Sequence, residues 1–296
     1  MEILLKYLQQ HHSSATAYSY HRNILIYLKE QPTAEKSNYK EIVNYIGQLR
    51  NRYSKGNTVK TILNSIKKYY DFLIATGKRK DHPCRNLNIK DRLHKDVQLQ
   101  DLLTENELEN LLNYKSKRFK GVLEVRDKAL LSLLIYQGLT KGEIKKLTVS
   151  DLNLEAGTIY IRSSKNSNSR TLELKNNQIL LLHKYIHEIR PQLLQKNKQL
   201  PSSVFGLPSL FITTKGKSEE GYSLKYMFKQ IRKEQGKSIT ISIIRQSVIA
   251  LKLKKGNDIR IVQSFAGHKN ASSTERYKAA DIEELKAGIN KYHPLK

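Results

Sequence analysis

The sequence predicts a mainly helical protein of two domains, the second of which contains a small antiparallel β-sheet. Two observations support this fold class. Apolar residues recur at helical spacing through residues 1–88, and residues 158–174 alternate apolar and polar side chains around a Ser/Asn-rich turn. Residues 80–101 carry a proline, many charges and no apolar period, which is typical of a linker. We therefore expect domains at 1–88 and 104–296, joined by a linker at 89–103.

The first domain is expected to be entirely helical. An early helix is predicted near residues 15–30. In the following segment Ile42, Tyr45, Ile46 and Leu49 fall at i, i+3, i+4 and i+7, and the pattern repeats from Val59 onward. We expect Asn57 to cap that last helix and Gly77 to end it.

Three lysines lie on the polar face of this last helix, opposite its apolar stripe. They are suited to hold phosphates, although a solvated helix face has the same composition, and both readings stay open. The three are Lys60, Lys67 and Lys68.

The second domain opens at Thr104, which is followed by Glu107 and an apolar run, the pattern of a helical capping box. The hairpin comes next, and mostly helix follows to the end of the chain. The tail, residues 279–296, places Ile282, Leu285 and Ile289 at i, i+3 and i+7, so we expect a short amphipathic helix there.

The charge of the chain points to a polyanionic partner. Its 53 Lys and Arg against 27 Asp and Glu give a formal net charge of +26 on 296 residues. Self-repulsion of this size is best relieved by nucleic acid. A generally cationic surface is the alternative. A membrane-surface protein is disfavoured because the charge is not gathered on one amphipathic helix. No segment is apolar for long enough to span a bilayer, and the single cysteine, Cys84, excludes an internal disulfide, so we expect a cytoplasmic protein that does not act at a membrane.

Common cofactor motifs fail on their spacing. Two Gly-Lys-Ser triplets begin at Gly216 and Gly236, but the glycine that a phosphate-binding loop needs five positions earlier is replaced by Phe211 and Ile231. The single cysteine, Cys84, also excludes a Cys-based zinc module, and we expect no metal and no nucleotide cofactor.

Four segments of the second domain, in this order, resemble the tyrosine recombinase or phage integrase family, with its Xer-like site-specific recombinases. The first domain resembles the helical core-binding domain of that family more loosely. The four segments are RDKALLSLLIYQGLTKGEIKKLTVSDLNL (126–154), IRSSKNSNSRTLEL (161–174), TISIIRQSVIALKLKKG (240–256) and SFAGHKNASSTERY (264–277).

The resemblance implies a two-domain clamp around double-stranded DNA that cleaves and rejoins strands through a covalent 3′-phosphotyrosyl intermediate. Tyr277 is the nucleophile that it implies, and a phenolate is also an acceptable leaving group. Arg245 and His268 match the positions that surround the phosphate, where charge develops. Lys165, on the hairpin, matches the general acid. Arg170, at the far end of that hairpin, is expected to contact DNA.

The sequence departs from the family at two usual catalytic positions. Thr140 stands where the resemblance places an arginine, and Ser242 stands where it places the histidine of the His-x-x-Arg box. Lys141, Arg126 or Lys128 are candidates for the missing charge. Cleavage inside an assembled complex that completes the site is a second explanation. The third is a degenerate relative that acts only as a sequence-specific DNA-binding or architectural protein.

In the family, a C-terminal tail like residues 279–296 docks on a neighbouring protomer. We therefore expect a monomer in solution and a homotetramer on paired sites; a terminal helix packed on its own chain is the alternative. An RNA-binding module is a weaker option, since no RNP-type or KH-type motif is present. The target site, the direction of recombination and any accessory DNA-binding proteins stay open.

Overall fold

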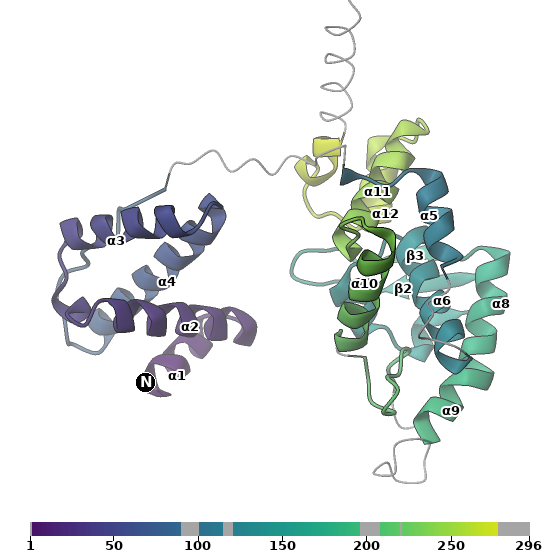
Figure 1. Cartoon of the computed structure of the whole chain (residues 1–296), viewed down its shortest axis with the longest axis horizontal. Coiled ribbons are helices and arrows are strands. Elements are labelled where there is room, and N and C mark those ends of the chain that lie inside the picture. Colours follow the sequence, from purple (N-terminus) through teal and green to yellow (C-terminus); the bar gives the residue numbers. More distant parts are fainter. Residues whose placement is uncertain (1, 90–100, 115–120, 196–207, 220, 278–296) are drawn as a thin grey trace, which may run out of the picture. The chain divides into compact units, whose positions relative to one another are not determined.

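The chain divides into two compact units, residues 1–95 and 96–296. The computed structural model describes residues 2–89, 101–114, 121–195, 208–219 and 221–277, and each unit is taken by itself below (Figure 1). The predicted fold class is confirmed: the chain is mostly helical with one small antiparallel sheet. Among the described residues, no helix is long and apolar enough to cross a membrane.

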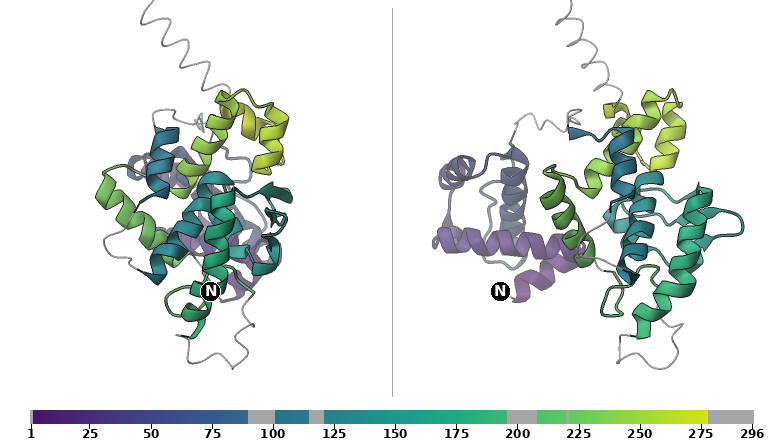
Figure 2. Two further views of the ribbon diagram at one scale, coloured as in Figure 1. Left: turned by 90° about the vertical axis from the view of Figure 1, so that its right-hand side faces the viewer. Right: turned by 45° about the vertical axis from the view of Figure 1, so that its right-hand side comes forward.

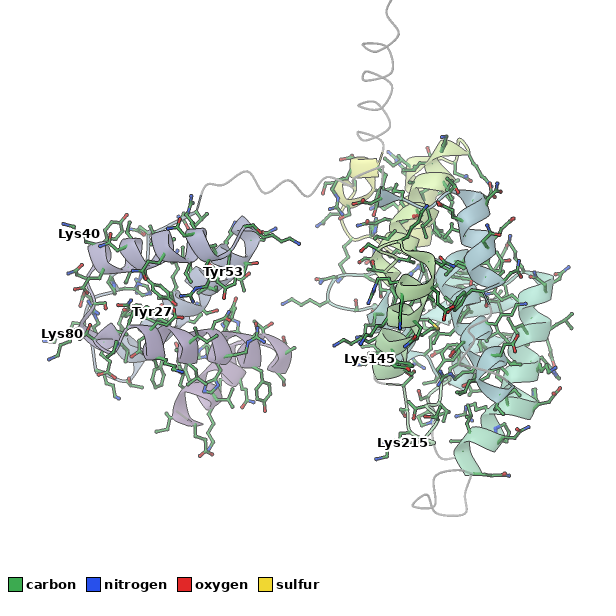
Figure 3. The ribbon with its side chains drawn as sticks, in the orientation of Figure 1. Tyr27, Lys40, Tyr53, Lys80, Lys145 and Lys215 are labelled. Carbon is green, nitrogen blue, oxygen red and sulfur yellow. The ribbon has the colours of Figure 1, made fainter. Side chains whose placement is uncertain are left out.

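The first unit is built from helices packed on an apolar core that is rich in tyrosine. Tyr27 and Tyr70 are buried there, and their hydroxyls lie 2.8 Å apart. Tyr70 donates on to the carbonyl of Ala34 at 2.7 Å. Figure 3 shows Tyr27 inside this core while Lys40 and Lys80 point away from it. The elements are α1 (Glu2–His11), α2 (Ser14–Glu30), the short 3₁₀ helix η1 (Ala34–Lys36), α3 (Tyr39–Arg52) and α4 (Gly56–Ala75).

The apolar spacing predicted α2, α3 and α4 correctly, but it missed α1. The cap assigned to Asn57 is wrong, because α4 already begins at Gly56 and Lys55 precedes it without a side-chain cap. Gly77 does follow the end of α4, with a φ of +70° that glycine tolerates.

The three lysines of α4 differ in what they contact. Lys60 is exposed. The Lys67 ammonium lies 3.4 Å from Asn88 Oδ1, and the Lys68 ammonium pairs with Asp71 at 2.8 Å. A DNA contact by Lys68 would therefore compete with an ion pair on its own helix.

The second unit surrounds a larger core. α6 (Figure 2) buries every side chain from Ala129 to Ile135, which explains why this part of the helix has apolar residues on all of its faces. Its helices are α5 (Glu105–Leu112), α6 (Val122–Tyr136), α7 (Lys141–Lys146), η3 (Val149–Asp151), α8 (Asn176–Lys184), the π-helix η4 (Tyr185–Ile189), α9 (Arg190–Gln195), α10 (Tyr222–Gln235), α11 (Ile241–Lys254) and α12 (Ile259–Ala266).

The predicted hairpin forms two of the three strands of the sheet. β2 (Thr158–Ile161) pairs antiparallel with β3 (Arg170–Glu173), with Ile161 opposite Arg170. A two-residue strand that the sequence did not reveal, β1 (Leu152–Asn153), adds to the other edge of β2, so the strand order is β1-β2-β3.

The capping box predicted at Thr104 is confirmed: its hydroxyl accepts from the amide of Glu107, whose carboxylate accepts from the amide of Thr104. The expected tail helix at residues 279–296 lies outside the described residues.

Candidate functional site

A cavity of about 440 Å³ opens where the start of α7, one face of α10 and the start of α11 meet. It collects four cationic side chains from these segments. Two threonines and a serine, Thr140, Thr240 and Ser242, also line it. The complete lining is Thr140, Lys141, Leu224, Lys225, Phe228, Arg232, Thr240, Ile241, Ser242 and Arg245.

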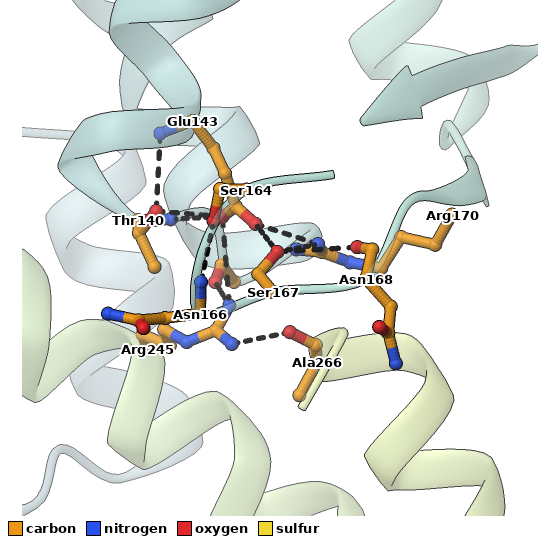
Figure 4. Close-up of polar contacts among 10 residues, drawn as sticks. Thr140, Glu143, Ser164, Asn166, Ser167, Asn168, Arg170, Arg245 and Ala266 are labelled. Carbon is orange, nitrogen blue, oxygen red and sulfur yellow. Dashed lines mark hydrogen bonds and ion pairs between the residues drawn. The ribbon is translucent and has the colours of Figure 1, made fainter. Parts of the chain in front are cut away.

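One buried carboxylate, Glu143, connects the segments behind this cavity (Figure 4). It completes the capping box of Thr140, whose amide donates to Oε2 at 2.7 Å. Its other oxygen, Oε1, accepts from Arg170 Nη1 at 2.7 Å and from the Ser167 hydroxyl at 3.1 Å. Arg245 Nη1 lies 3.9 Å from Oε2. A single side chain of α7 thus fixes the hairpin and α11 to one place.

The charges in this network support one another. Burial alone would raise the pKa of Glu143, but the Arg170 guanidinium, the Thr140 backbone and Arg245 outweigh it and hold that pKa below its usual value. Burial lowers the pKa of Arg245, and the negative charge of Glu143 opposes this. Glu143 is therefore ionised at neutral pH, and its charge stabilises both guanidinium groups.

Arg245 itself is held by backbone. Its Nη1 donates to the carbonyl of Gly138 at 2.6 Å and its Nη2 to the carbonyl of Ala266 at 2.5 Å. The side chain is 13% exposed, and it joins the turn before α7 to the end of α12. It reaches the cavity in a fixed orientation, as a preorganised donor should.

The turn between β2 and β3 docks on the end of α12. The amide of Asn168 donates to the carbonyl of Gly267 at 2.9 Å, and Ser167 forms an isolated antiparallel bridge with His268. Gly267 ends α12 with a φ of +68°, and a Cβ there would lie 2.6 Å from Arg170 Nη1. Only glycine allows this close approach of hairpin and helix end.

Lys165 lies at the exposed tip of the turn. It stands between Ser164 and Ser167, where the Ser164 amide donates to the Ser167 carbonyl at 2.8 Å. This hydrogen bond closes the turn below Lys165, and the lysine side chain is exposed to solvent.

The expected DNA contact by Arg170 is not supported by the structure. Its side chain is only 4% exposed and its charge is taken by Glu143. Within the described residues, its Nε and Nη2 have no hydrogen-bond partner. Arg170 instead packs under the turn that carries Lys165.

His268 is partly buried, and its Nδ1 lies 2.8 Å from the Thr274 hydroxyl. Burial lowers the pKa of His268 to about 4, and the charges of Arg245, Arg276 and Arg170 contribute to this. The imidazole is therefore neutral at pH 7 and acts as a hydrogen-bonding group, not as a cation.

Tyr277 is 5% exposed and packs against Ile249, Val262 and Ala266. Burial raises its pKa, while the charges of Arg276 and Arg245 lower it to a smaller extent. The residue lines a different cavity, of about 520 Å³, that also includes Leu102 and Leu103. The structure therefore brings Thr140, Lys141, Ser242 and Arg245 together, whereas Tyr277 lies outside that cavity and Lys165 is held on its separate turn.

Of the three candidates for the charge missing at Thr140, one lines the cavity and two do not. Arg126 is 3% exposed and its Nε donates to Asp127 at 2.8 Å, so it does not reach the cavity. Lys128 lines a separate small pocket with Asp127. Lys141 does line the cavity.

Sequence reasoning missed two further cations, Lys225 and Arg232. With Phe228 they stand at i, i+3 and i+7 of α10, a spacing that places them on one face. That spacing could be recognised in the sequence, but only the fold shows that this face of α10 adjoins α7 and α11.

Comparison with known proteins identifies the family. Residues 101–284 match the model of the phage integrase family. The chain is 30% identical to tyrosine recombinase XerD of Oceanobacillus iheyensis over 290 residues, which cover 95% of this chain and 93% of that protein. It is 25% identical to tyrosine recombinase XerA of Pyrococcus furiosus over 262 residues, covering 86% and 81% of the two chains.

Solved structures of similar fold include the Tn1549 transposon integrase in complex with circular intermediate DNA, with a TM-score of 0.67 and 16% identity over 95% of this chain and 99% of that one. The XerH recombinase bound to its difH substrate gives a TM-score of 0.61 and 19% identity, covering 85% and 70%. At these identities the likeness concerns the fold.

Proposed function

The chain belongs to the phage integrase family, and we propose that it is a site-specific DNA recombinase that cleaves and rejoins strands through Tyr277. The observation that carries this proposal is the cavity at the starts of α7 and α11, where Arg245 and Ser242 meet a group of cations suited to a phosphate. His268 and Tyr277 lie close enough for the charge of Arg245 to act on their pKa values.

In the proposed reaction the phenolic oxygen of Tyr277 attacks the phosphorus of the scissile phosphodiester, and the phenol proton passes to water. Arg245 donates to the non-bridging oxygens, which gain charge in the transition state, and neutral His268 adds an N–H donor. The bond to the 5′ oxygen breaks, and Lys165 protonates this leaving group. A 3′-phosphotyrosyl bond remains, and a 5′ hydroxyl reverses the steps to rejoin strands.

Tyr277 must leave its apolar contacts before it can attack. Only 5% of the residue is exposed in the structure, so Tyr277 is not presented to a duplex in this conformation. We propose that DNA binding accompanies a displacement of residues 268–277, which turn away from α12 at Gly267.

The proposed partner is double-stranded DNA. A formal net charge of +26 supplies the electrostatic affinity, and a few base contacts select the site. Lys60 and Lys67 are the α4 residues that remain suited to hold phosphates, and Lys68 would first have to give up Asp71.

We further propose a monomer in solution that assembles into a homotetramer on paired sites through residues 281–296. Removing these residues should abolish recombination and leave binding to a single site intact, as measured by gel shift. Unchanged recombination by the truncated chain would exclude this role.

The test of function is a covalent adduct. The full-length protein is incubated with nicked suicide duplexes made from sequence flanking its own gene, and a protein-DNA adduct that survives denaturation is sought. We expect the adduct with the wild-type chain and none with Tyr277→Phe, which should keep its DNA affinity.

A matched control is Tyr160→Phe, on an exposed tyrosine of β2 that is 45% exposed; it should form adduct normally. Tight, footprinted binding without any adduct would refute the recombinase and leave a DNA-binding protein.

A further inference from the structure

The Thr140 hydroxyl cannot replace an arginine at the phosphate. Its Oγ1 accepts from the amide of Glu143 at 3.2 Å and donates to Oε2 of the same residue at 2.9 Å. Both functions of the hydroxyl are used in capping α7. The cavity must therefore obtain charge from other side chains if it is to stabilise a phosphoryl transition state.

The α10 face supplies such charge. Phe228, 3% exposed, anchors this face in the core, and Lys225 and Arg232 stand on either side of it along the helix. Nη1 of Arg232 donates to the carbonyl of Ile239 at 3.2 Å. This contact fixes the guanidinium, and the group has further N–H donors to offer because arginine carries five.

Lys141 approaches the same region from α7. A Cβ on Gly221, the residue before α10, would lie 2.9 Å from the Lys141 Nζ, so the lysine lies directly over the backbone at the start of α10. The positive end of a helix dipole disfavours a cation there, and the buried carboxylate of Glu219, which accepts from the Gly221 amide, offsets part of this effect. An anion in the cavity would relieve this repulsion.

In the part of the chain that the structure describes, no ion pair neutralises this group of cations. Among the described residues, no carboxylate lines the cavity or forms an ion pair with Lys141, Lys225 or Arg232. Glu143, the nearest negative charge discussed above, is engaged with Arg170 and Arg245. Glu219, the buried carboxylate at the start of α10, offsets the charge near Lys141 in part, whereas the charged residues that line the cavity itself are all cations.

We infer that Lys225 and Arg232 of α10, together with Lys141, bind the non-bridging oxygens of the scissile phosphate and take the place of the arginine that is absent at Thr140. This inference rests on the proposed recombinase function. It makes Lys225 and Arg232 catalytic residues, contributed by a helix that lies in none of the four segments on which the family resemblance depends.

The test measures adduct formation at saturating protein on the nicked suicide duplex, so that binding does not limit the rate. We expect Lys225→Gln to slow cleavage about tenfold or more, because removing one donor from a developing charge costs about 10²- to 10³-fold at a fully preorganised site and an exposed lysine is less firmly held. Lys233→Gln is the matched control, since Lys233 is an exposed lysine of α10 outside the cavity lining. Equal rates for the two variants would overturn the inference.

A second substrate isolates the charge on phosphorus. In a duplex with a neutral methylphosphonate at the scissile position, the defect of Lys225→Gln should shrink to less than about threefold, because the oxygen charge that the lysine stabilises is reduced. A defect of the same size on both substrates would assign Lys225 a structural role and overturn the inference. For Arg232, Arg232→Lys should retain more activity than Arg232→Gln, and equal losses in both would remove this residue from the site.

Failure of the proposed function has a different signature. If the wild-type chain forms no adduct on any substrate, the recombinase is refuted, and the cavity is then judged by thermal stabilisation with inorganic sulfate. Saturable stabilisation that is weakened in Lys225→Gln but not in Lys233→Gln supports an oxyanion site. Equal stabilisation of all three chains would overturn it.

Discussion

Replacing Glu143 by glutamine should strongly destabilise the second unit. The side chain is 4% exposed and is the ionic partner of Arg170, which is equally buried, and of Arg245. Glutamine keeps the shape but removes the negative charge. Because Nε and Nη2 of Arg170 already lack partners among the described residues, the guanidinium would be left as a buried charge without an anion.

Breaking a buried ion pair by removing one partner costs about 3 to 5 kcal/mol. The measurement is native-state hydrogen exchange of α6 amides in the full-length protein, because α6 lies in the core of this unit and its slowest amides report global opening. At about 1.4 kcal/mol for each tenfold change, protection should fall by roughly 100-fold to a few thousand-fold.

The same replacement at an exposed glutamate provides the comparison. Glu109→Gln, on α5, should change protection by less than about threefold, since surface substitutions stay within about 0.5 kcal/mol. If α6 protection in Glu143→Gln matched that in Glu109→Gln, the reasoning about the Glu143 network would be refuted.

The contribution of Glu143 to the free energy of unfolding depends on pH with a defined sign. Because the pKa of Glu143 is lowered in the folded state, its contribution to stability is present above its unfolded pKa of about 4.3 and is lost as pH falls through the folded value. The difference between wild type and Glu143→Gln should therefore narrow in acid.

Three further predictions concern the same region. Gly267→Ala should destabilise the chain by more than Gly77→Ala, as measured by chemical denaturation of the two variants. Both glycines have a positive φ, which costs about 1 kcal/mol or more for alanine. A Cβ would meet Arg170 at Gly267, whereas nothing lies within 4 Å of a Cβ at Gly77. His268 should titrate near pH 4 in an NMR pH series, and a midpoint at its ordinary value would contradict the burial argument. Because the folded pKa lies below the ordinary value of about 6.5, the free energy of unfolding should rise with pH between these two values. His268→Asn should remove this dependence. Thr240→Ala should cost about 0.5 to 2 kcal/mol by removing the hydroxyl that caps α11, seen as faster exchange of α11 amides, and unchanged exchange would show that the cap adds nothing.

Local rules predicted much of the fold. The 3.6-residue spacing of apolar side chains predicts α3 and α4 because each buries a single stripe, and the alternation in residues 158–174 predicts β2 and β3 because one face of each strand is buried. The strand β1 has only two residues, too few for any pattern, and its pairing with β2 depends on tertiary contacts.

The site was predictable only in part. The order of the four segments identified Arg245, Ser242, Thr140 and Lys141, which the fold gathers in one cavity. The burial of Arg170 was not predictable, since a guanidinium at the end of a polar turn is ordinarily exposed, and only the partner 27 positions earlier in the chain, Glu143, makes burial tolerable. Likewise, the sequence of α10 shows which residues share a face but not which other helices that face adjoins.

The burial of Tyr277 has a consequence for how such a protein would search a chromosome. A strongly basic chain binds many wrong sequences before it meets the right one, and at each of them an accessible phenolate beside a scissile phosphate would risk an unwanted nick. If Tyr277 is the nucleophile, as proposed above, its packing against Ile249, Val262 and Ala266 would let the protein scan DNA without leaving breaks. Fidelity would then depend on the free energy needed to withdraw one aromatic ring from its apolar contacts. Only binding to the correct site would supply that free energy.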